Sequence, residues 1–211
     1  MLHVNEIFDS ISGEVGIIPQ GALTTFLRLQ GCNLRCAYCD AKNSQDTDTD
    51  LIGWLSLPYI EERVYRKNGR LLVTGGEPLL QYSQVERLCI QLSGRGKFTI
   101  QLETNGTKPI FSGNTRIRGI ESIVMDYKLD NPPLRENFKF LYHDDWVKIV
   151  VSDLSQLKDV SDILSFFNRA EFNLAVSATD VTMYPEIIRT VRKVNPRTII
   201  NAQLHKFIGV S

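Results

Sequence analysis

The segment FLRLQGCNLRCAYCD, residues 26–40, decides how this chain is interpreted. It continues the β-favouring run TTFLRL, residues 24–29, which predicts a buried strand. Three cysteines follow at once, Cys32, Cys36 and Cys39, in a C-x3-C-x2-C arrangement. A strand that leads directly into clustered thiols predicts a metal or cofactor site at the carboxyl end of that strand.

Zinc and an iron–sulfur cluster are the two explanations of this thiol group. A structural zinc site is closed by four ligands, usually from two paired knuckles. The other candidate ligands have no such spacing and stand far away in the sequence: His3, Cys89, His143 and His205. A cubane cluster held by three cysteines leaves one iron open for a substrate or cofactor. The spacing therefore favours the cluster over zinc.

Beyond this segment, short apolar runs alternate with stretches compatible with helices. The strand-like runs occupy residues 70–76, 98–106, 121–129, 146–153, 172–180 and 198–205, and helices are expected at 84–92, 154–168 and 185–194. This alternation predicts βαβ units and an α/β fold with a mostly parallel sheet. The polar stretch 42–50 and the proline-containing stretch 130–145 are interpreted as loops rather than domain linkers, so one domain spanning 1–211 is expected.

Composition narrows the class of protein. Of 211 residues, 43% are hydrophobic and 23% charged, which is ordinary for a globular chain. Lys and Arg number 24, as do Asp and Glu, so no positive excess favours nucleic acid as a partner. No apolar run reaches the roughly 18 residues of a membrane span, and the start MLHVNEIFDS does not resemble a signal peptide. A cytoplasmic protein is expected, in which clustered thiols indicate metal rather than disulfides.

Polar residues gather at the carboxyl ends of the other predicted strands. VTGGEPLL, residues 73–80, follows the second strand, and its glycine pair allows close backbone approach, although GGEP alone also suits a turn before a helix. ETNG (103–106), MDYKL (125–129) and SATD (177–180) follow later strands. From the residues alone, TNG is a turn, the charges of MDYKL are a solvated ion pair and SATD is a helix cap.

Together these segments resemble the radical S-adenosylmethionine (SAM) enzymes, and specifically the 7-carboxy-7-deazaguanine synthase family of deazapurine (queuosine-type) biosynthesis. The resemblance runs from about Asn5 to Ser211 and is strongest in FDSISGE, FLRLQGCNLRCAYCD, TGGEP, ETNG, MDYKL and QLHK. It implies a shortened, modified (β/α) barrel of the radical SAM type, usually a homodimer.

The resemblance also implies the chemistry. The family converts 6-carboxy-5,6,7,8-tetrahydropterin to 7-carboxy-7-deazaguanine with loss of ammonia, which makes it a carbon–nitrogen lyase. A [4Fe-4S] cluster on Cys32, Cys36 and Cys39 would bind SAM, and one electron, from a flavodoxin or ferredoxin, would cleave it to a 5′-deoxyadenosyl radical. That radical takes a hydrogen atom from the substrate, and SAM is regenerated.

Site residues follow from matching positions. For SAM, the resemblance implies Tyr38, Gly75, Gly76, Glu77, Glu103, Asn105, Asp126, Lys128, Ser177 and Asp180; for the pterin, it implies Ile11, Ser12, Gly13, Glu14, Arg28, Thr74 and Ser211. A guanidinium such as that of Arg28 suits the substrate carboxylate. Simpler alternatives remain for two of these residues, since Tyr38 could be a packing residue and Arg28 a charge at a strand edge.

Magnesium is the point at which the sequence departs from the family. The family has Asp followed by Thr or Ser after the last cysteine, and that hydroxyl helps to hold Mg²⁺. Here Asp40 is followed by Ala41, which has no side-chain oxygen, although Mg²⁺ requires oxygen ligands. Water, Asp40 and Ser44 are the remaining donors, and a magnesium requirement is left open.

Two other functions are consistent with the thiol motif. A glycyl-radical activating enzyme carries the same cysteine spacing but acts on a partner protein's glycine, and the GE and QLHK segments argue against it. A zinc-stabilised binding module would carry out no catalysis.

Overall fold

Nine strands form the main sheet of the computed structural model, which describes residues 1–46, 52–65, 69–96 and 98–210. In chain order the strands are β1 (Leu2–Ile11), β2 (Leu23–Leu29), β3 (Gly53–Leu55), β4 (Arg70–Gly75), β5 (Thr99–Thr104), β8 (Ser122–Lys128), β9 (Trp146–Val151), β10 (Asn173–Ala178) and β11 (Ile199–Asn201). They lie in the order β11-β10-β9-β8-β5-β4-β2-β1-β3. The sheet formed by the described residues is thus open, a partial barrel.

All seven strands expected from the sequence are present, and they run parallel to one another. β1 and β3 add an antiparallel edge beside β2. The sequence did not predict β1, because its burial falls from one end of the strand to the other instead of alternating between residues. The expected modified barrel with a mostly parallel sheet is confirmed.

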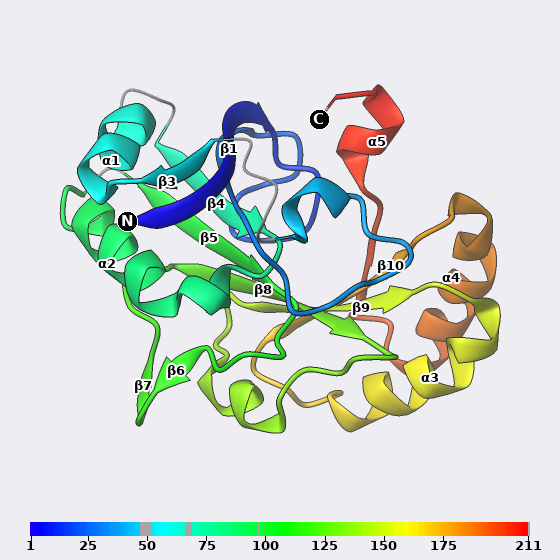
Figure 1. The fold of residues 1–211 in the computed structure, drawn as a ribbon. Coiled ribbons are helices and arrows are strands. Elements are labelled where there is room, and N and C mark those ends of the chain that lie inside the picture. Colours follow the sequence, from blue (N-terminus) through cyan, green and yellow to red (C-terminus); the bar gives the residue numbers. More distant parts are fainter. Residues whose placement is uncertain (47–51, 66–68, 97, 211) are drawn as a thin grey trace.

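Four helices pack beside the sheet: α1 (Leu57–Tyr65), α2 (Tyr82–Ser93), α3 (Leu157–Phe166) and α4 (Tyr184–Val194). Figure 1 shows α1 and α2 at one end of the sheet and α3 and α4 at the other. The expected helices at 84–92 and 185–194 are confirmed. The one expected at 154–168 is shorter, because Asp153 and Gln156 form a capping box around a separate 3₁₀ turn, Leu154–Gln156.

The helices present apolar stripes to the sheet. In α2 the buried positions recur every three or four residues and are Val85, Leu88, Cys89 and Leu92. Facing strand residues such as Ile100 and Leu102 of β5 are fully buried. Each fully buried aliphatic side chain contributes about 1.5–3 kcal/mol. This layer stabilises the scaffold from which the loops at the carboxyl ends of the strands extend.

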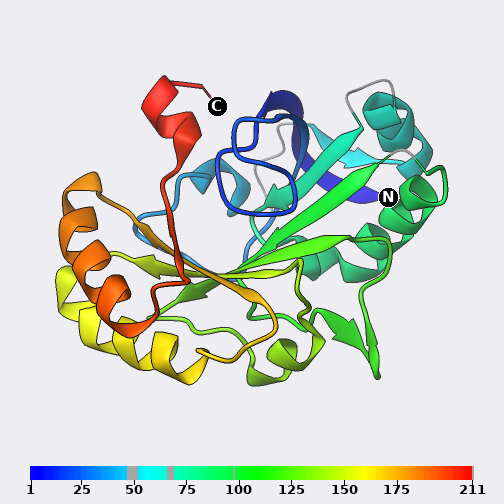
Figure 2. The same cartoon turned by 180° about the vertical axis from the view of Figure 1, so that it is seen from behind.

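The loop between β1 and β2, residues 12–22, is held against the sheet by strand side chains. The Val15 N–H donates to Asn201 Oδ1 of β11 (2.9 Å), and the Ile18 N–H donates to Gln101 Oε1 of β5 (3.2 Å). Figures 1 and 2 show this loop on the same side of the sheet as α5 (Leu204–Ile208). Strands far apart in the sheet order are thereby joined through one loop.

Both stretches interpreted as loops contain short helical turns. The first, 42–50, begins with a 3₁₀ turn, Lys42–Ser44, whose Ser44 is fully buried, and its remainder from residue 47 lies outside the described residues. The second, 130–145, contains a 3₁₀ helix at Arg135–Phe140. A small antiparallel hairpin of β6 (Phe111–Ser112) and β7 (Thr115–Arg116), not predicted from the sequence, precedes β8.

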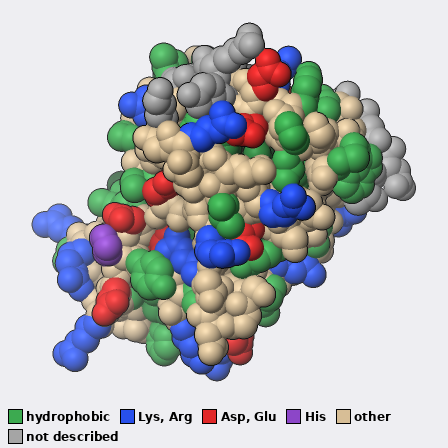
Figure 3. Space-filling model, turned by 90° about the vertical axis from the view of Figure 1, so that its left-hand side faces the viewer, with side chains coloured by type: hydrophobic (Ala, Val, Ile, Leu, Met, Phe, Trp, Pro, Cys, Tyr) green, Lys and Arg blue, Asp and Glu red, His purple; other side chains and the backbone are tan. Residues whose placement is uncertain are grey.

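The surface agrees with the balanced charge of the sequence. On the face seen in Figure 3, basic and acidic side chains are interspersed, and neither sign gathers into one large patch. None of the helices in the described part of the chain is both long enough and apolar enough to cross a bilayer.

Asp145, directly before β9, is the buried charge that ties β7, β8 and β9 together. Arg116 of β7 donates Nη1 to Oδ2 (2.7 Å) and Nη2 to Oδ1 (2.9 Å). The backbone N–H groups of Ile123 and Tyr142 donate to the same carboxylate at 2.7 and 2.6 Å. A bidentate pair with two further hydrogen bonds satisfies a carboxylate that is fully buried.

We predict that Asp145→Ala lowers the free energy of unfolding by about 3–5 kcal/mol, because it leaves the Arg116 charge buried without its partner. Asp144→Ala is the matched control, since Asp144 is exposed and pairs only with the exposed His143 among the described residues. Its effect is expected within about 0.5 kcal/mol. Denaturant titration measures both, and equal effects of the two substitutions would contradict this role of Asp145.

Candidate active site

A cavity of about 780 Å³ opens at the carboxyl ends of the parallel strands. The residues predicted for the site that line it are Ile11, Gly13, Glu14, Arg28, Cys32, Cys36, Tyr38, Cys39, Asp40, Thr74, Gly75, Gly76, Glu103, Asn105, Asp126, Lys128, Ser177 and Asp180. Ser12 and Glu77 do not line it, and Ser211 lies outside the described residues. The fold thus brings most of the predicted site together around one space.

The three clustered cysteines lie half-buried on the wall of this cavity, whereas Cys89 is buried in the α2 stripe. The Leu34 N–H and the Asn105 amide donate to Cys32 Sγ at 3.4 and 3.9 Å. Such donors stabilise a thiolate, the form that binds metal. Burial raises the pKa of the Cys32 and Cys36 thiols. Metal binding would therefore have to offset the free energy needed to remove their protons.

In the described part of the chain the thiols are not gathered around one point. Within the described ranges, no three His, Cys, Asp or Glu side chains are grouped as ligands of one metal ion. A tetrahedral zinc requires its ligands to converge on one point, whereas the thiolates of a cubane bind separate irons.

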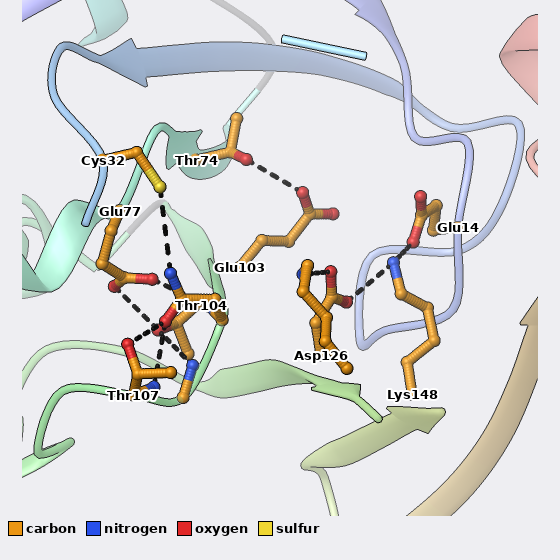
Figure 4. A network of polar contacts seen from close by, with 12 residues as sticks. Glu14, Cys32, Thr74, Glu77, Glu103, Thr104, Thr107, Asp126 and Lys148 are labelled. Atoms are coloured by element: carbon orange, nitrogen blue, oxygen red, sulfur yellow. Dashed lines mark hydrogen bonds and ion pairs between the residues drawn. The ribbon is translucent and has the colours of Figure 1, made fainter. Parts of the chain in front are cut away.

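Glu77 has a different place from the one predicted for it. The side chain is fully buried, and its Oε1 accepts hydrogen bonds from the Leu79 N–H (2.9 Å) and the Thr104 hydroxyl (2.8 Å). Its Oε2 accepts from the Asn105 N–H (2.8 Å). Figure 4 shows the Glu77 side chain beside Thr104. Burial raises the pKa of Glu77. In this arrangement Glu77 joins the GGEP loop to the ETNG loop behind the cavity wall.

The glycine pair of GGEP allows close contact between two backbones. A Cβ on Gly75, whose φ is +134°, would lie 2.3 Å from the backbone of Leu29, and one on Gly76 would lie 2.1 Å from the carbonyl oxygen of Gly31. The Glu77 N–H donates to that same Gly31 carbonyl (2.8 Å). The segment that leads into the cysteines therefore rests directly on GGEP.

Glu103 and Thr74 form the next part of the wall. The Thr74 hydroxyl donates to Glu103 Oε2 (3.0 Å), and both residues line the cavity (Figure 4). Burial, with the nearby charge of Asp126 adding to it, raises the pKa of Glu103 to about 7. Both the protonated and the ionised form of Glu103 are therefore accessible near neutral pH.

Opposite charges alternate along β8 and β9. Lys128 Nζ lies 2.6 Å from Asp126 Oδ2, and Lys148 Nζ of β9 lies 3.0 Å from Asp126 Oδ1. Lys148 also forms an ion pair with Glu14, whose other oxygen accepts a hydrogen bond from Gln203 Nε2 (2.5 Å). The ion pair expected between Asp126 and Lys128 is present, and its side chains, 25% and 14% exposed, face the cavity rather than the outer surface.

The loop after β1 reaches the cavity at Gly13 and Glu14. A Cβ on Gly13 would lie 1.9 Å from Nδ1 of His205 of α5, so a larger residue here would displace the His205 ring. Ser12 is fully buried, and its N–H and C=O pair with Ala22 and Gly21. Those backbone groups are therefore engaged within the loop.

Arg28 of β2 also lines the cavity. Its Nε is 2.7 Å from Glu6 Oε1, and its guanidinium carbon is 5.3 Å from the centre of the Phe8 ring. The ion pair involves the inner nitrogen, so a bound carboxylate would use the two terminal nitrogens.

The residues after the last cysteine do not fit a magnesium ion. Asp40 Oδ2 lies 3.3 Å from Lys206 Nζ of α5, and this ammonium helps to lower the pKa of Asp40. Ala41 is buried and supplies no oxygen, and the Ser44 hydroxyl donates to the Ala41 carbonyl (2.8 Å). The positive charge beside Asp40 is therefore the ammonium of Lys206.

Three remaining residues line the cavity from other segments. Burial raises the pKa of Tyr38 to about 12, which keeps its hydroxyl protonated. Ser177 Oγ accepts from the Asn201 amide (3.4 Å). Asp180 accepts from the Thr182 N–H (2.8 Å) and hydroxyl (2.7 Å), so its reading as a helix cap is confirmed while it also borders the cavity.

Several polar cavity residues were not predicted, and four of them lie on β9 or in the QLHK segment: Lys148, Gln203, His205 and Lys206. The sequence carried a signal for each. Lys148 is a charge inside the apolar run WVKIVV, and the other three belong to QLHK, a segment assigned to the family resemblance but to no role.

Comparisons with known proteins agree with this geometry. A family model of the radical SAM superfamily matches residues 27–113. The 7-carboxy-7-deazaguanine synthase of Clostridium acetobutylicum is 36% identical over 97% of this chain and 95% of its own length. The enzyme of that name from Methanospirillum hungatei is 34% identical over 99% and 86%.

Solved structures show the same fold. QueE from Escherichia coli superimposes with a TM-score of 0.74 at 19% identity, over 97% of this chain and 94% of that one. SuiB from Streptococcus suis bound to S-adenosylmethionine gives 0.55 at 16% identity, over 78% and 44%. Identity above 30% over nearly the whole length of two enzymes of that name places the chain in the 7-carboxy-7-deazaguanine synthase family of radical SAM enzymes.

Proposed function

We propose that the protein converts 6-carboxy-5,6,7,8-tetrahydropterin to 7-carboxy-7-deazaguanine with release of ammonia, as a carbon–nitrogen lyase of deazapurine biosynthesis. The observation that carries the proposal is the single cavity lined by both the three free thiols and the predicted substrate residues. A flavodoxin or ferredoxin is the proposed reductant, and a homodimer the proposed assembly.

Cys32, Cys36 and Cys39 would hold a [4Fe-4S] cluster. When bound, the reduced cluster and SAM supply a 5′-deoxyadenosyl radical that removes a hydrogen atom from the substrate. The protein's contribution is positioning: Gly75, Gly76, Asn105 and the ends of β8 and β10 line the same cavity as the cysteines.

The substrate would lie between β2 and the loop after β1. Arg28 would bind the pterin carboxylate, and Glu14 would accept N–H groups of the pterin ring. Glu103, with its pKa near 7, is suited to hold or release a proton at its Oε atoms.

The deciding experiment is an anaerobic turnover assay of cluster-reconstituted protein with 6-carboxytetrahydropterin, SAM and dithionite, read by mass spectrometry. The expected product is 7-carboxy-7-deazaguanine. A glycyl-radical activating enzyme would leave the pterin intact, and a zinc module would be colourless and would take up no iron or sulfide.

Cys36→Ala is expected to abolish 5′-deoxyadenosine formation, because the cluster loses one of three ligands. Cys89→Ala is the matched control, since that thiol is buried in the α2 stripe away from the cavity lining. Iron content and 5′-deoxyadenosine are measured in both variants. Persistent activity of Cys36→Ala would remove this thiol from the mechanism.

Arg28→Ala is expected to raise the KM for the pterin by about 10- to 100-fold, since a charge-assisted bidentate contact of about 1.5–3 kcal/mol is lost. Slow SAM cleavage without substrate should persist. Arg28→Lys tests the fork geometry and should recover only part of the affinity. An unchanged KM in Arg28→Ala would show that the carboxylate binds elsewhere.

Magnesium is expected to change the rate of the natural protein less than about twofold, because Ala41 provides no ligand and Asp40 is paired with Lys206. Ala41→Thr supplies the missing hydroxyl and should increase the response to Mg²⁺. Rates with added Mg²⁺ and with chelator measure this. A strict requirement in the natural protein would contradict the prediction.

A further inference from the structure

Lys148 is a buried lysine whose side chain contacts carboxylates from two segments of the cavity wall. Burial lowers the pKa of Lys148, and its two carboxylate partners favour the charged form. Its side chain is only 7% exposed, and it lies in β9 between the apolar Val147 and Ile149. The ammonium contacts the Glu14 carboxylate from the loop after β1 and Asp126 Oδ1 of β8 at 3.0 Å (Figure 4). A buried lysine is retained where its charge is paired.

The two carboxylates depend on Lys148 to different degrees. Asp126 has a second cation, Lys128, at 2.6 Å. For Glu14, Lys148 is the one ion-pair partner found in the described part of the chain, beside the neutral donor Gln203. Loss of the Lys148 charge should therefore affect Glu14 more than Asp126.

We propose that Lys148 is a positioning residue for the substrate: it fixes the Glu14 carboxylate at the cavity wall, where that carboxylate accepts N–H groups of the pterin ring. This rests on the proposed function. Each carboxylate oxygen accepts two hydrogen bonds. Gln203 uses one position on Oε1 and Lys148 one on Oε2, so one position on each oxygen remains for a ligand.

Without the ammonium, Glu14 and Asp126 would be two carboxylates facing the same space. Repulsion at low dielectric would turn Glu14 away or protonate it, and a protonated carboxyl loses acceptor capacity. The other charged or titratable groups around this part of the cavity come from β2, the thiol loop, β5, β8 and α5, and are Arg28, Asp40, Glu103, Lys128, His205 and Lys206.

The test compares ligand affinities of the reconstituted holoenzyme by anaerobic equilibrium dialysis without reductant. One series measures 6-carboxytetrahydropterin in the presence of SAM, and the other measures SAM alone. The variants are Lys148→Met, Lys148→Arg, Glu14→Gln and the double variant Glu14→Gln/Lys148→Met. The control is Lys158→Met, which removes an exposed lysine of α3.

Lys148→Met is expected to raise the Kd for the pterin about 10-fold or more, and the Kd for SAM by less than about threefold. Lys148→Arg should recover most of the pterin affinity. The double variant should bind pterin as well as Glu14→Gln alone, because Lys148 acts through Glu14. Lys158→Met should leave both constants unchanged.

An unchanged pterin Kd in Lys148→Met, or equal losses for pterin and SAM, would overturn the proposal. If Lys148→Met takes up no cluster, the double variant decides, since it removes both charges of the pair. Its equality with Glu14→Gln supports the proposal, and a further loss of pterin affinity overturns it. Failure of the proposed function is a separate result: natural protein that makes no deazaguanine.

Discussion

The contact on which the site depends is that of the buried Glu77 carboxylate with two neighbouring loops. Its hydrogen bonds to Leu79, Thr104 and Asn105 fix GGEP against ETNG. GGEP in turn supports the backbone of Leu29 and Gly31, and Gly31 is followed by the first cysteine. Asn105 then reaches Cys32 Sγ. The position of the thiols is thus determined by a charge that does not line the cavity.

This arrangement explains why a carboxylate is found at a fully buried position. Burying an ionised group without partners costs several kcal/mol, whereas three hydrogen-bond donors, two of them backbone N–H groups, offset that cost. An amide at this position could not accept the same bonds on both of its polar atoms. The contacts between the two loops alone therefore account for a carboxylate at this position of GGEP, whether or not it also contacts a ligand.

The sequence predicted the parallel strands and the α2 and α4 helices well, because buried strands such as Leu71–Val73 are short continuous apolar runs and stripes such as Val85–Leu92 recur at helical spacing. It did not predict β1, which pairs with β2 along most of its length but with β3 only at Leu2–Val4. Residues that line the cavity were predicted only where they belong to a recognised sequence motif. The role of Glu77 was not, since no local pattern shows whether an acid after a strand points into a cavity or behind it.

Residues that act between distant elements were missed for the same reason. Lys148 and Gln203 are more than fifty positions apart, and each acquires its meaning only through Glu14, near the beginning of the chain. Gln101 and Asn201 likewise have polar side chains inside strands because the loop after β1 requires acceptors for its N–H groups. Such requirements arise from the open barrel, in which a loop lies against the side chains of the sheet.

Charge balance around the cavity follows from these pairings and indicates where an anion can enter. Glu14, Asp126 and Asp40 each contact a lysine, namely Lys148, Lys128 and Lys206. Glu103 has no such partner among the described residues and is brought toward neutrality by burial instead. Arg28 differs from Lys148 and Lys128 because its partner, Glu6, is 39% exposed and can be solvated if the pair opens, as can Asp40 beside Lys206. Lys148 and Lys128 contact carboxylates that are largely buried, so an incoming carboxylate meets a lower desolvation cost at Arg28 or Lys206, whose partners can return to solvent. Of these two cations, only Arg28 offers a planar guanidinium fork to a carboxylate.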